Sequence, residues 1–198
     1  MTDTNTNMQA TSGRVGDVEL FRGALVRLTA WDPDADAATY ASWREDARFF
    51  RLGFDQPLKP MSVGEARTEL ERRVGAPDDR IEFAVRPLDG DGLLGEARLY
   101  DIVWTHRTAM VGLGIGRTDD WGRGYGTDVM RLLLRYAFEE LNLHRLWLDT
   151  FAYNDRAIAL YRGLGFVEEG RLREQLLRDG RRHDVILMGL LRSEWVAT

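Results

Sequence analysis

The sequence contains no cysteine, and other scarce features narrow its possible functions further. Without cysteine the chain can form no disulfide, no zinc–thiolate site and no thiol nucleophile. Its three histidines are scattered without metal-ligand spacing, so we expect no bound metal. No stretch approaches the ~20 consecutive apolar residues of a membrane span, and the first residues form no apolar signal core. These absences predict a cytoplasmic protein without membrane contact.

What the chain does contain is enough apolar material for one globular domain. It has 198 residues, 44% of them hydrophobic, and a chain of this length buries roughly 70% of the surface that it exposes when unfolded. Residues 1–18 are polar and lack periodicity, which predicts a disordered tail before a single domain over residues 19–198. The net charge of -5 disfavours nucleic acid as a partner and tolerates a cationic substrate.

Apolar periodicity divides the domain into helices and strands. It predicts helices over residues 32–44, 62–74, 126–141 and 154–164, and strands over 24–28, 81–85, 95–100, 110–115, 145–151, 166–172 and 183–191. Ser62 and Glu65 form a capping box at the second helix. The aromatic stretch with Phe49, Phe50 and Phe54 is predicted to be a loop, either core filler or one wall of a substrate pocket. Strands in series with intercalated helices indicate an α/β or α+β sheet domain.

Three glycines at alternate positions, Gly122, Gly124 and Gly126, stand at the start of the longest predicted helix. Glycine lets the backbone approach a ligand, and the free N–H groups of a first helical turn favour an anion such as phosphate or pyrophosphate. Arg123 adds a positive charge to the same loop. The spacing fits neither a P-loop nor a dinucleotide-binding fingerprint. The alternative is a tight turn that binds nothing.

Two motifs in the second half of the chain resemble the GCN5-related N-acetyltransferase (GNAT) superfamily. Trp121-Gly-Arg-Gly-Tyr-Gly126 is similar to the family's Gln/Arg-x-x-Gly-x-Gly/Ala, and the segment from Asn154 to Phe166 to its Asn-x-x-Ala-x-x-x-Tyr-x-x-x-Gly-Phe element. Both ends of the domain are similar to the branch that acetylates ribosomal-protein N-termini and spermidine. The resemblance implies a GNAT fold, a mixed, mostly antiparallel twisted sheet flanked by helices. It also implies that the sheet is splayed between its fourth and fifth strands, here residues 109–115 and 145–150, to admit acetyl-CoA.

The resemblance also implies roles for individual residues. It makes Tyr161 the acid that protonates the departing CoA thiolate, although packing alone could explain this tyrosine. Asn154 would contact the cofactor as well as cap its helix. The pantetheine arm would lie along the backbone of Leu113, Gly114 and Ile115, and the pyrophosphate on the loop formed by Gly122, Arg123, Gly124, Tyr125, Gly126 and Thr127.

Two departures from the family pattern leave questions open. Trp121 replaces the Gln or Arg that begins the phosphate motif, so one side-chain contact is lost. Met110 stands where many relatives carry a glutamate that serves as general base. An alkylammonium with a pKa of about 10.4 must lose a proton before it can attack a thioester. Glu96, Asp101 and His106 are alternative bases by position, and ordered water is another.

The sequence therefore predicts an N-acetyltransferase that moves an acetyl group from acetyl-CoA to a primary amine by direct attack in a ternary complex. A protein N-terminus, a polyamine and a small amine such as an antibiotic all remain open as acceptors. A longer acyl group and a homodimer also remain open. The alternative function is an acyl-CoA-binding module without catalysis, which the missing glutamate keeps open.

Overall fold

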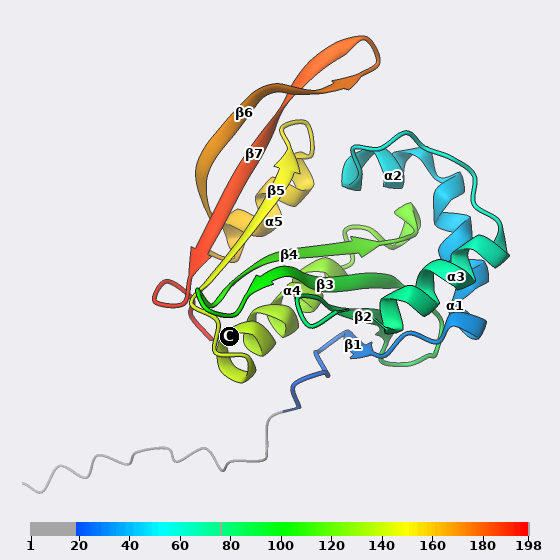
Figure 1. Cartoon of the computed structure of the whole chain (residues 1–198), viewed down its shortest axis with the longest axis horizontal. Coiled ribbons are helices and arrows are strands. Elements are labelled where there is room, and N and C mark those ends of the chain that lie inside the picture. Colours follow the sequence, from blue (N-terminus) through cyan, green and yellow to red (C-terminus); the bar gives the residue numbers. More distant parts are fainter. Residues whose placement is uncertain (1–18, 76, 198) are drawn as a thin grey trace, which may run out of the picture.

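One twisted sheet of seven strands organises the chain in a computed structural model that describes residues 19–75 and 77–197 (Figure 1). The strand order is β1-β2-β3-β4-β5-β7-β6. Every neighbouring pair is antiparallel except β4 and β5, which run parallel. The expected mixed, mostly antiparallel sheet is therefore confirmed. The predicted disordered tail, residues 1–18, lies outside the described residues.

The elements follow the predicted order, with differences at their ends. The strands are β1 (Val26–Thr29), β2 (Ile81–Pro87), β3 (Gly95–Val103), β4 (Thr108–Ile115), β5 (Arg145–Phe151), β6 (Val167–Arg178) and β7 (Arg181–Leu191). The helices are α1 (Pro33–Ser42), η1 (Trp43–Glu45), α2 (Ala47–Gly53), α3 (Val63–Val74), η2 (Thr118–Asp120), α4 (Tyr125–Arg135), η3 (Tyr136–Glu140) and α5 (Asp155–Gly163). Among the described residues, none of these helices has the length and apolar character to cross a membrane.

The aromatic stretch that was predicted to be a loop contains helix α2, so that prediction was wrong. Asp46 caps this helix by accepting hydrogen bonds from the N–H groups of Arg48 at 2.9 Å and Phe49 at 3.1 Å. The helix has only 7 residues, which is too short for a helical repeat of apolar residues to stand out in the sequence.

The long helix predicted over residues 126–141 is α-helical only as far as Arg135. Tyr136–Glu140 form a π-helical turn, in which the N–H of Leu141 donates to the C=O of Tyr136 at 3.0 Å. Within this wider turn the consecutive residues Ala137 and Phe138 are both fully buried.

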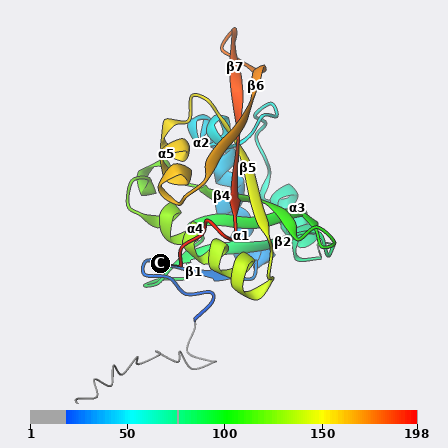
Figure 2. The ribbon, with the colours of Figure 1, turned by 90° about the vertical axis from the view of Figure 1, so that its left-hand side faces the viewer.

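Helices cover the two faces of the sheet around two separate cores (Figures 1 and 2). On one face, α4 and α5 pack with the strands in the larger core, which includes Val85 and Leu146. On the other face, α1 and α3 pack around Leu70 and Ala84. Ala84 and Val85 are consecutive on β2, and the alternation of a strand sends them to opposite faces.

The strands β4 and β5 stay together over only three residue pairs. These pairs are Thr108↔Arg145, Ala109↔Leu146 and Met110↔Trp147, after which the two strands diverge (Figure 1). Beyond this point β4 remains paired with β3, and β5 remains paired with β7. The facing edges of β4 and β5 are thus left without a partner strand, and the expected splay of the sheet is confirmed.

A buried carboxylate fixes the start of α4 against the first strand. Asp128 accepts hydrogen bonds from the N–H groups of Ala24, Leu25 and Val26 at 3.1, 2.7 and 3.0 Å. A Cβ atom at Gly23 would lie only 2.4 Å from Asp128 Oδ2, so glycine at this position leaves room for the carboxylate. These bonds hold the beginning of α4, where the glycine motif lies, in a defined place.

Candidate active site

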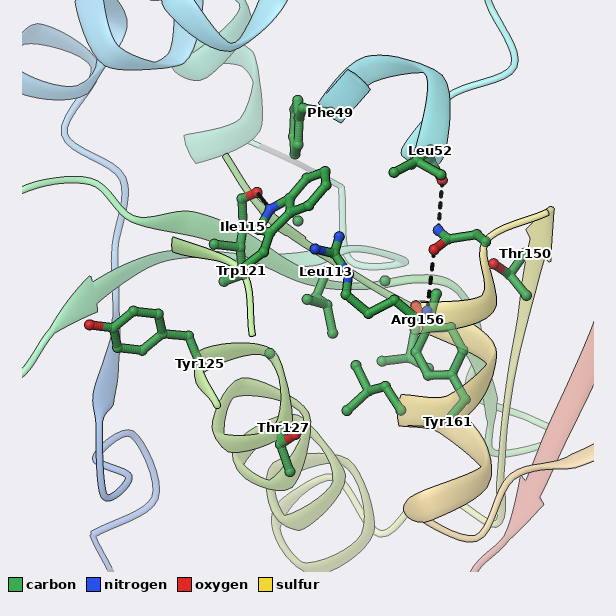
Figure 3. Close-up of a pocket in the computed structure, with 18 of the residues that line it drawn as sticks. Phe49, Leu52, Leu113, Ile115, Trp121, Tyr125, Thr127, Thr150, Arg156 and Tyr161 are labelled. Carbon is green, nitrogen blue, oxygen red and sulfur yellow. Dashed lines mark hydrogen bonds between the residues drawn. The ribbon is translucent and has the colours of Figure 1, made fainter. Parts of the chain in front are cut away.

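A cavity of about 370 Å³ opens between the diverging strands (Figure 3). It is lined by the edge of β4, by the end of β5 with the first turns of α5, by the glycine loop before α4, and by α2. It brings together every residue predicted to form the site except Arg123. These residues are Leu113, Gly114, Ile115, Gly122, Gly124, Tyr125, Gly126, Thr127, Asn154 and Tyr161.

The free edge of β4 directs main-chain hydrogen-bonding groups into this cavity. The N–H of Gly116 donates to the C=O of Leu94, on the β3 side, at 3.0 Å. The C=O of Ile115 points the other way and accepts a hydrogen bond from Trp121 Nε1 at 2.8 Å (Figure 3). Because main-chain groups alternate in direction along a strand, the N–H and C=O of Leu113 also face the cavity. A ligand with amide groups, such as a pantetheine arm, could pair with this edge as a strand would.

The glycine loop presents free N–H groups at the start of α4. Gly122 and Gly124 have φ values of +76° and +88°, which side-chain-bearing residues rarely adopt. In the part of the chain that the structure describes, no side chain caps this helix, so its first N–H groups stay available for an anion. Arg123 lies outside the cavity lining and donates to Asp120 at 3.0 Å, so its charge is already balanced.

Asn154 joins α5 to the helix that covers the cavity. Its Oδ1 accepts a hydrogen bond from the N–H of Ala157 at 3.2 Å, the N-cap role that asparagine commonly fills. Its Nδ2 donates to the C=O of Leu52 at 3.1 Å (Figure 3). The hydroxyl of Tyr153 donates to the C=O of Arg51 at 2.6 Å. The end of α2 is thereby tied to the segment between β5 and α5, across the opening of the split.

The aromatic residues of α2 fill both of the roles that the sequence left open. Phe50 is fully buried, whereas Phe49 is buried and also lines the cavity. A Cβ atom at Gly114 would lie 3.3 Å from the Phe49 ring, so the absence of a side chain on β4 lets the ring lie close over the strand. Phe49 therefore gives the cavity an apolar cover.

Tyr161 lies at the boundary between the core and the cavity (Figure 3). Its ring packs edge-on against Phe166 with a centroid distance of 5.8 Å, and the residue is 8% exposed. Burial, followed by the charges of Tyr100 and Asp149, raises the pKa of its hydroxyl to about 12. The hydroxyl is therefore protonated at neutral pH, which is the state that a proton donor requires.

The sequence suggested three residues as the general base, and none of them presents a free carboxylate or imidazole to the cavity. Glu96 is buried and contacts Arg73 at 2.6 Å and Arg98 at 3.5 Å. Burial alone would raise the pKa of Glu96, but these two guanidinium groups lower it overall. Asp101 and His106 lie at or beside the turn between β3 and β4, at the closed end of the split, and neither lines the cavity.

A carboxylate that the sequence analysis did not single out, Asp149, does line the cavity. It lies on β5, two residues beyond the last pair between β4 and β5. The Asp149 side chain is exposed to solvent on one side, but partial desolvation by the surrounding cavity, followed by the negative charge of Asp55, raises its pKa, and Arg98 partly opposes this rise. Its charge also raises the pKa of Tyr161, so the two groups lie near one another. Strand alternation places Asp149 on the face of β5 opposite to Leu148, but it does not reveal that this face borders a cavity, which only the split creates.

Comparisons with known proteins identify the family of this chain. Residues 26–167 match the acetyltransferase (GNAT) domain family. The spermidine N(1)-acetyltransferase of Escherichia coli K12 is 32% identical over 152 residues, covering 77% of this chain and 78% of that protein. The spermidine N(1)-acetyltransferase of Vibrio cholerae is 36% identical over 104 residues, which is 52% of this chain and 60% of that protein, less than two thirds of its length.

Similarity to a solved structure extends over more of the chain. The crystal structure of spermidine N-acetyltransferase from Vibrio cholerae, in complex with CoA and spermine, matches with a TM-score of 0.75 and 27% identity. The match covers 85% of this chain and 96% of the other.

Gly126 provides a test of the glycine loop as an anion site. A Cβ atom there would make ordinary contacts with Leu160 at 3.6 Å and Leu113 at 3.7 Å, so the backbone can carry a side chain without strain. We expect Gly126→Asp to weaken CoA binding by about 10²-fold in calorimetric titration, because it adds a negative charge beside the phosphates. Gly126→Ala is the matched control and should bind CoA nearly as wild type does. Equal affinities for both variants would contradict the assignment.

Proposed function

The chain belongs to the GNAT acetyltransferase family, and we propose that it transfers the acetyl group of acetyl-CoA to a primary amine by direct attack in a ternary complex. The observation that carries this proposal is the cavity between β4 and β5, where a free main-chain edge, an uncapped glycine loop and Tyr161 converge. A chain without cysteine has no thiol to carry an acyl intermediate, which favours direct transfer over a ping-pong route through cysteine.

In this proposal the free edge of β4 performs two tasks. Towards its end, the main-chain groups of Leu113 and Ile115 hold the pantetheine arm. Nearer the junction with β5, the N–H of Val111 faces the cavity by the same alternation and donates to the thioester oxygen as negative charge develops on it. A fixed N–H donor in a site shielded from water needs no reorganisation during the reaction.

We assign the two proton transfers to Asp149 and Tyr161. Asp149 lines the cavity, and its raised pKa makes its carboxylate a better proton acceptor than an ordinary aspartate. It would take the proton that an alkylammonium must lose before its nitrogen attacks the thioester carbon. Tyr161, protonated at neutral pH, would then donate to the CoA thiolate as the carbon–sulfur bond breaks. The attacking nitrogen loses its second proton as it becomes an amide, and this proton restores the Tyr161 hydroxyl.

A cationic amine of the polyamine type is the acceptor that these charges favour. Asp149 lines the cavity, and Asp55 lies near enough for its negative charge to act on Asp149, so this part of the site attracts an alkylammonium. The relatives from Vibrio cholerae and Escherichia coli K12 bear the name spermidine N(1)-acetyltransferase, and a solved neighbour holds spermine. Protein N-termini and small amines are the competing acceptors. A cytoplasmic location and a homodimer stay predictions.

The proposal is tested by measuring acetyl-CoA binding and CoA thiol release in parallel. The acceptors would be spermidine and spermine, peptides with free N-termini, and small amine antibiotics. We expect acetyl-CoA to bind and thiol release to saturate with a polyamine. Turnover with peptides alone would overturn the polyamine assignment. Acetyl-CoA binding without thiol release on any amine would favour the non-catalytic acyl-CoA-binding module.

Replacing Tyr161 tests its role as the acid. Tyr161→Phe keeps the ring that packs against Phe166 and removes only the hydroxyl. We expect kcat to fall by about 10²-fold, the lower end for general acid catalysis, because a CoA thiolate is already a tolerable leaving group. The acetyl-CoA dissociation constant should stay within a few-fold of wild type. Tyr136→Phe, outside the cavity lining, is the control. A kcat for Tyr161→Phe within threefold of wild type would return this residue to a packing role.

Replacing Asp149 tests the base and gives a second readout in stability. Asp149→Asn should lower kcat by about 10² to 10⁴-fold with little change in acetyl-CoA affinity. The folded state raises the pKa of Asp149 and so disfavours its charged form, and the groups that act on it are Asp55 and Arg98. The variant should therefore unfold at higher denaturant concentration than wild type at pH 7. This gain should disappear below a pH of about 3.9, where the carboxyl is neutral in both the folded and unfolded states.

The control for this experiment is Asp101→Asn, an aspartate on β3 outside the cavity lining. Asp101→Asn should leave kcat at the wild-type value. It should also lack the gain in stability at pH 7 that is expected for Asp149→Asn. If Asp149→Asn retains wild-type kcat on the true acceptor, another group or ordered water takes the proton.

A further inference from the structure

Trp121 holds two arginines from distant parts of the chain at the edge of the cavity. Its Nε1 donates to the C=O of Ile115 at 2.8 Å, which fixes the orientation of the indole. The guanidinium carbon of Arg156 lies 3.5 Å from the centroid of a Trp121 ring, and Figure 3 shows the two side chains close together. The guanidinium carbon of Arg48 lies 5.2 Å from the ring. Both distances fit cation–π contacts.

Neither guanidinium group is balanced by a carboxylate among the residues that the structure describes. Other arginines near the cavity have such partners, since Arg51 pairs with Asp179 and Arg123 with Asp120. Burial, followed by the positive charge of Arg48, lowers the pKa of Arg156. Two like charges held close together without a counter-charge repel one another, and an anionic ligand would relieve that repulsion.

The two arginines stand directly beside the glycine loop. Arg156 lines the cavity together with Gly122 and Gly124. Arg48 and Arg156 also line a second hollow, which shares Trp121 with the first. An anion bound at the N-terminus of α4 would therefore have two guanidinium groups within the same connected space.

We propose that Arg48 and Arg156, held by Trp121, bind the phosphate groups of acetyl-CoA, an inference that rests on the proposed function. Trp121 stands where the family pattern has a glutamine or arginine, and its indole contributes no charge. It instead positions two cations from α2 and α5. Guanidinium groups offer paired N–H donors that match phosphate oxygens, and they add the net charge that the N–H groups of the loop lack.

The proposal is tested with Arg48→Gln, Arg156→Gln and the double variant. Arg162→Gln is the matched control, since Arg162 lies on the same helix but pairs with Glu168. Calorimetric titration with CoA should show each single variant binding about 10-fold more weakly, and the double variant about 10²-fold more weakly. The control should bind within twofold of wild type, and Arg156→Lys should retain part of the lost affinity because it keeps the charge.

Two further ligands identify which phosphate the arginines hold. Dephospho-CoA lacks the 3′-phosphate, and pantetheine lacks the pyrophosphate as well. If the arginines bind the pyrophosphate, the double variant loses affinity for both CoA and dephospho-CoA. If they bind the 3′-phosphate, it loses affinity for CoA alone. Either result supports the proposal, provided that pantetheine binds wild type and the double variant equally.

Thermal melting separates a ligand-binding role from a structural one. The ligand-free double variant should melt close to wild type, because the loss of repulsion offsets the lost ring contacts. Its melting temperature should rise less than that of wild type when CoA is added, because the rise follows affinity. If wild type binds CoA and the double variant binds it equally well, the phosphate assignment fails and the proposed function stands. If wild type does not bind CoA, the proposed function itself fails.

Discussion

The short parallel contact between β4 and β5 sets the position of the cavity and of the groups that line it. Three residue pairs join the half of the sheet formed by β1 to β4 to the half formed by β5, β7 and β6. Main-chain N–H and C=O groups that lack a partner are costly when buried. The split places such groups along one cavity, where a ligand carrying its own amides can satisfy them. The same divergence leaves Asp149 at the side of the cavity.

Contacts far from the three residue pairs that join β4 and β5 fix the width of the cavity between these strands. On one side, α4 and α5 share the larger core with strands from both halves. On the other, Tyr153 and Asn154 hold the carbonyl end of α2, and Arg51 of this helix pairs with Asp179 at the tip of the β6–β7 hairpin. The cavity is thus shaped before any ligand arrives, which lowers the ordering cost of binding.

Charge is distributed unevenly around this cavity. Half-buried Arg73 binds Glu82 at 2.9 Å and Glu96 at 2.6 Å, so these carboxylates hold α3 against β2 and β3 and are committed to ion pairs. Among the described residues, Arg48 and Arg156 beside the glycine loop and Asp149 near Tyr161 have no ion-pair partner. In the proposed reaction the first pair faces phosphates and Asp149 faces an amine. A site that is positive towards one substrate and negative towards the other favours one orientation of both.

Features that depend on residues close together in the chain could be predicted from the sequence. The capping box of Ser62 and Glu65 and the N-cap role of Asn154 follow from side chains that reach main-chain groups three residues away. The glycine loop and the order of strands and helices could also be predicted, because they too depend on residues that are close together in the sequence.

The meeting of distant groups in the cavity could not be predicted from the sequence, because it depends on how the sheet and helices pack. Asn154 bonds to Leu52 across 102 positions, Arg48 meets Arg156 on Trp121, and Glu96 is committed to Arg73. Short-range periodicity carries no information about such pairs, because the packing of the sheet and helices sets their separation.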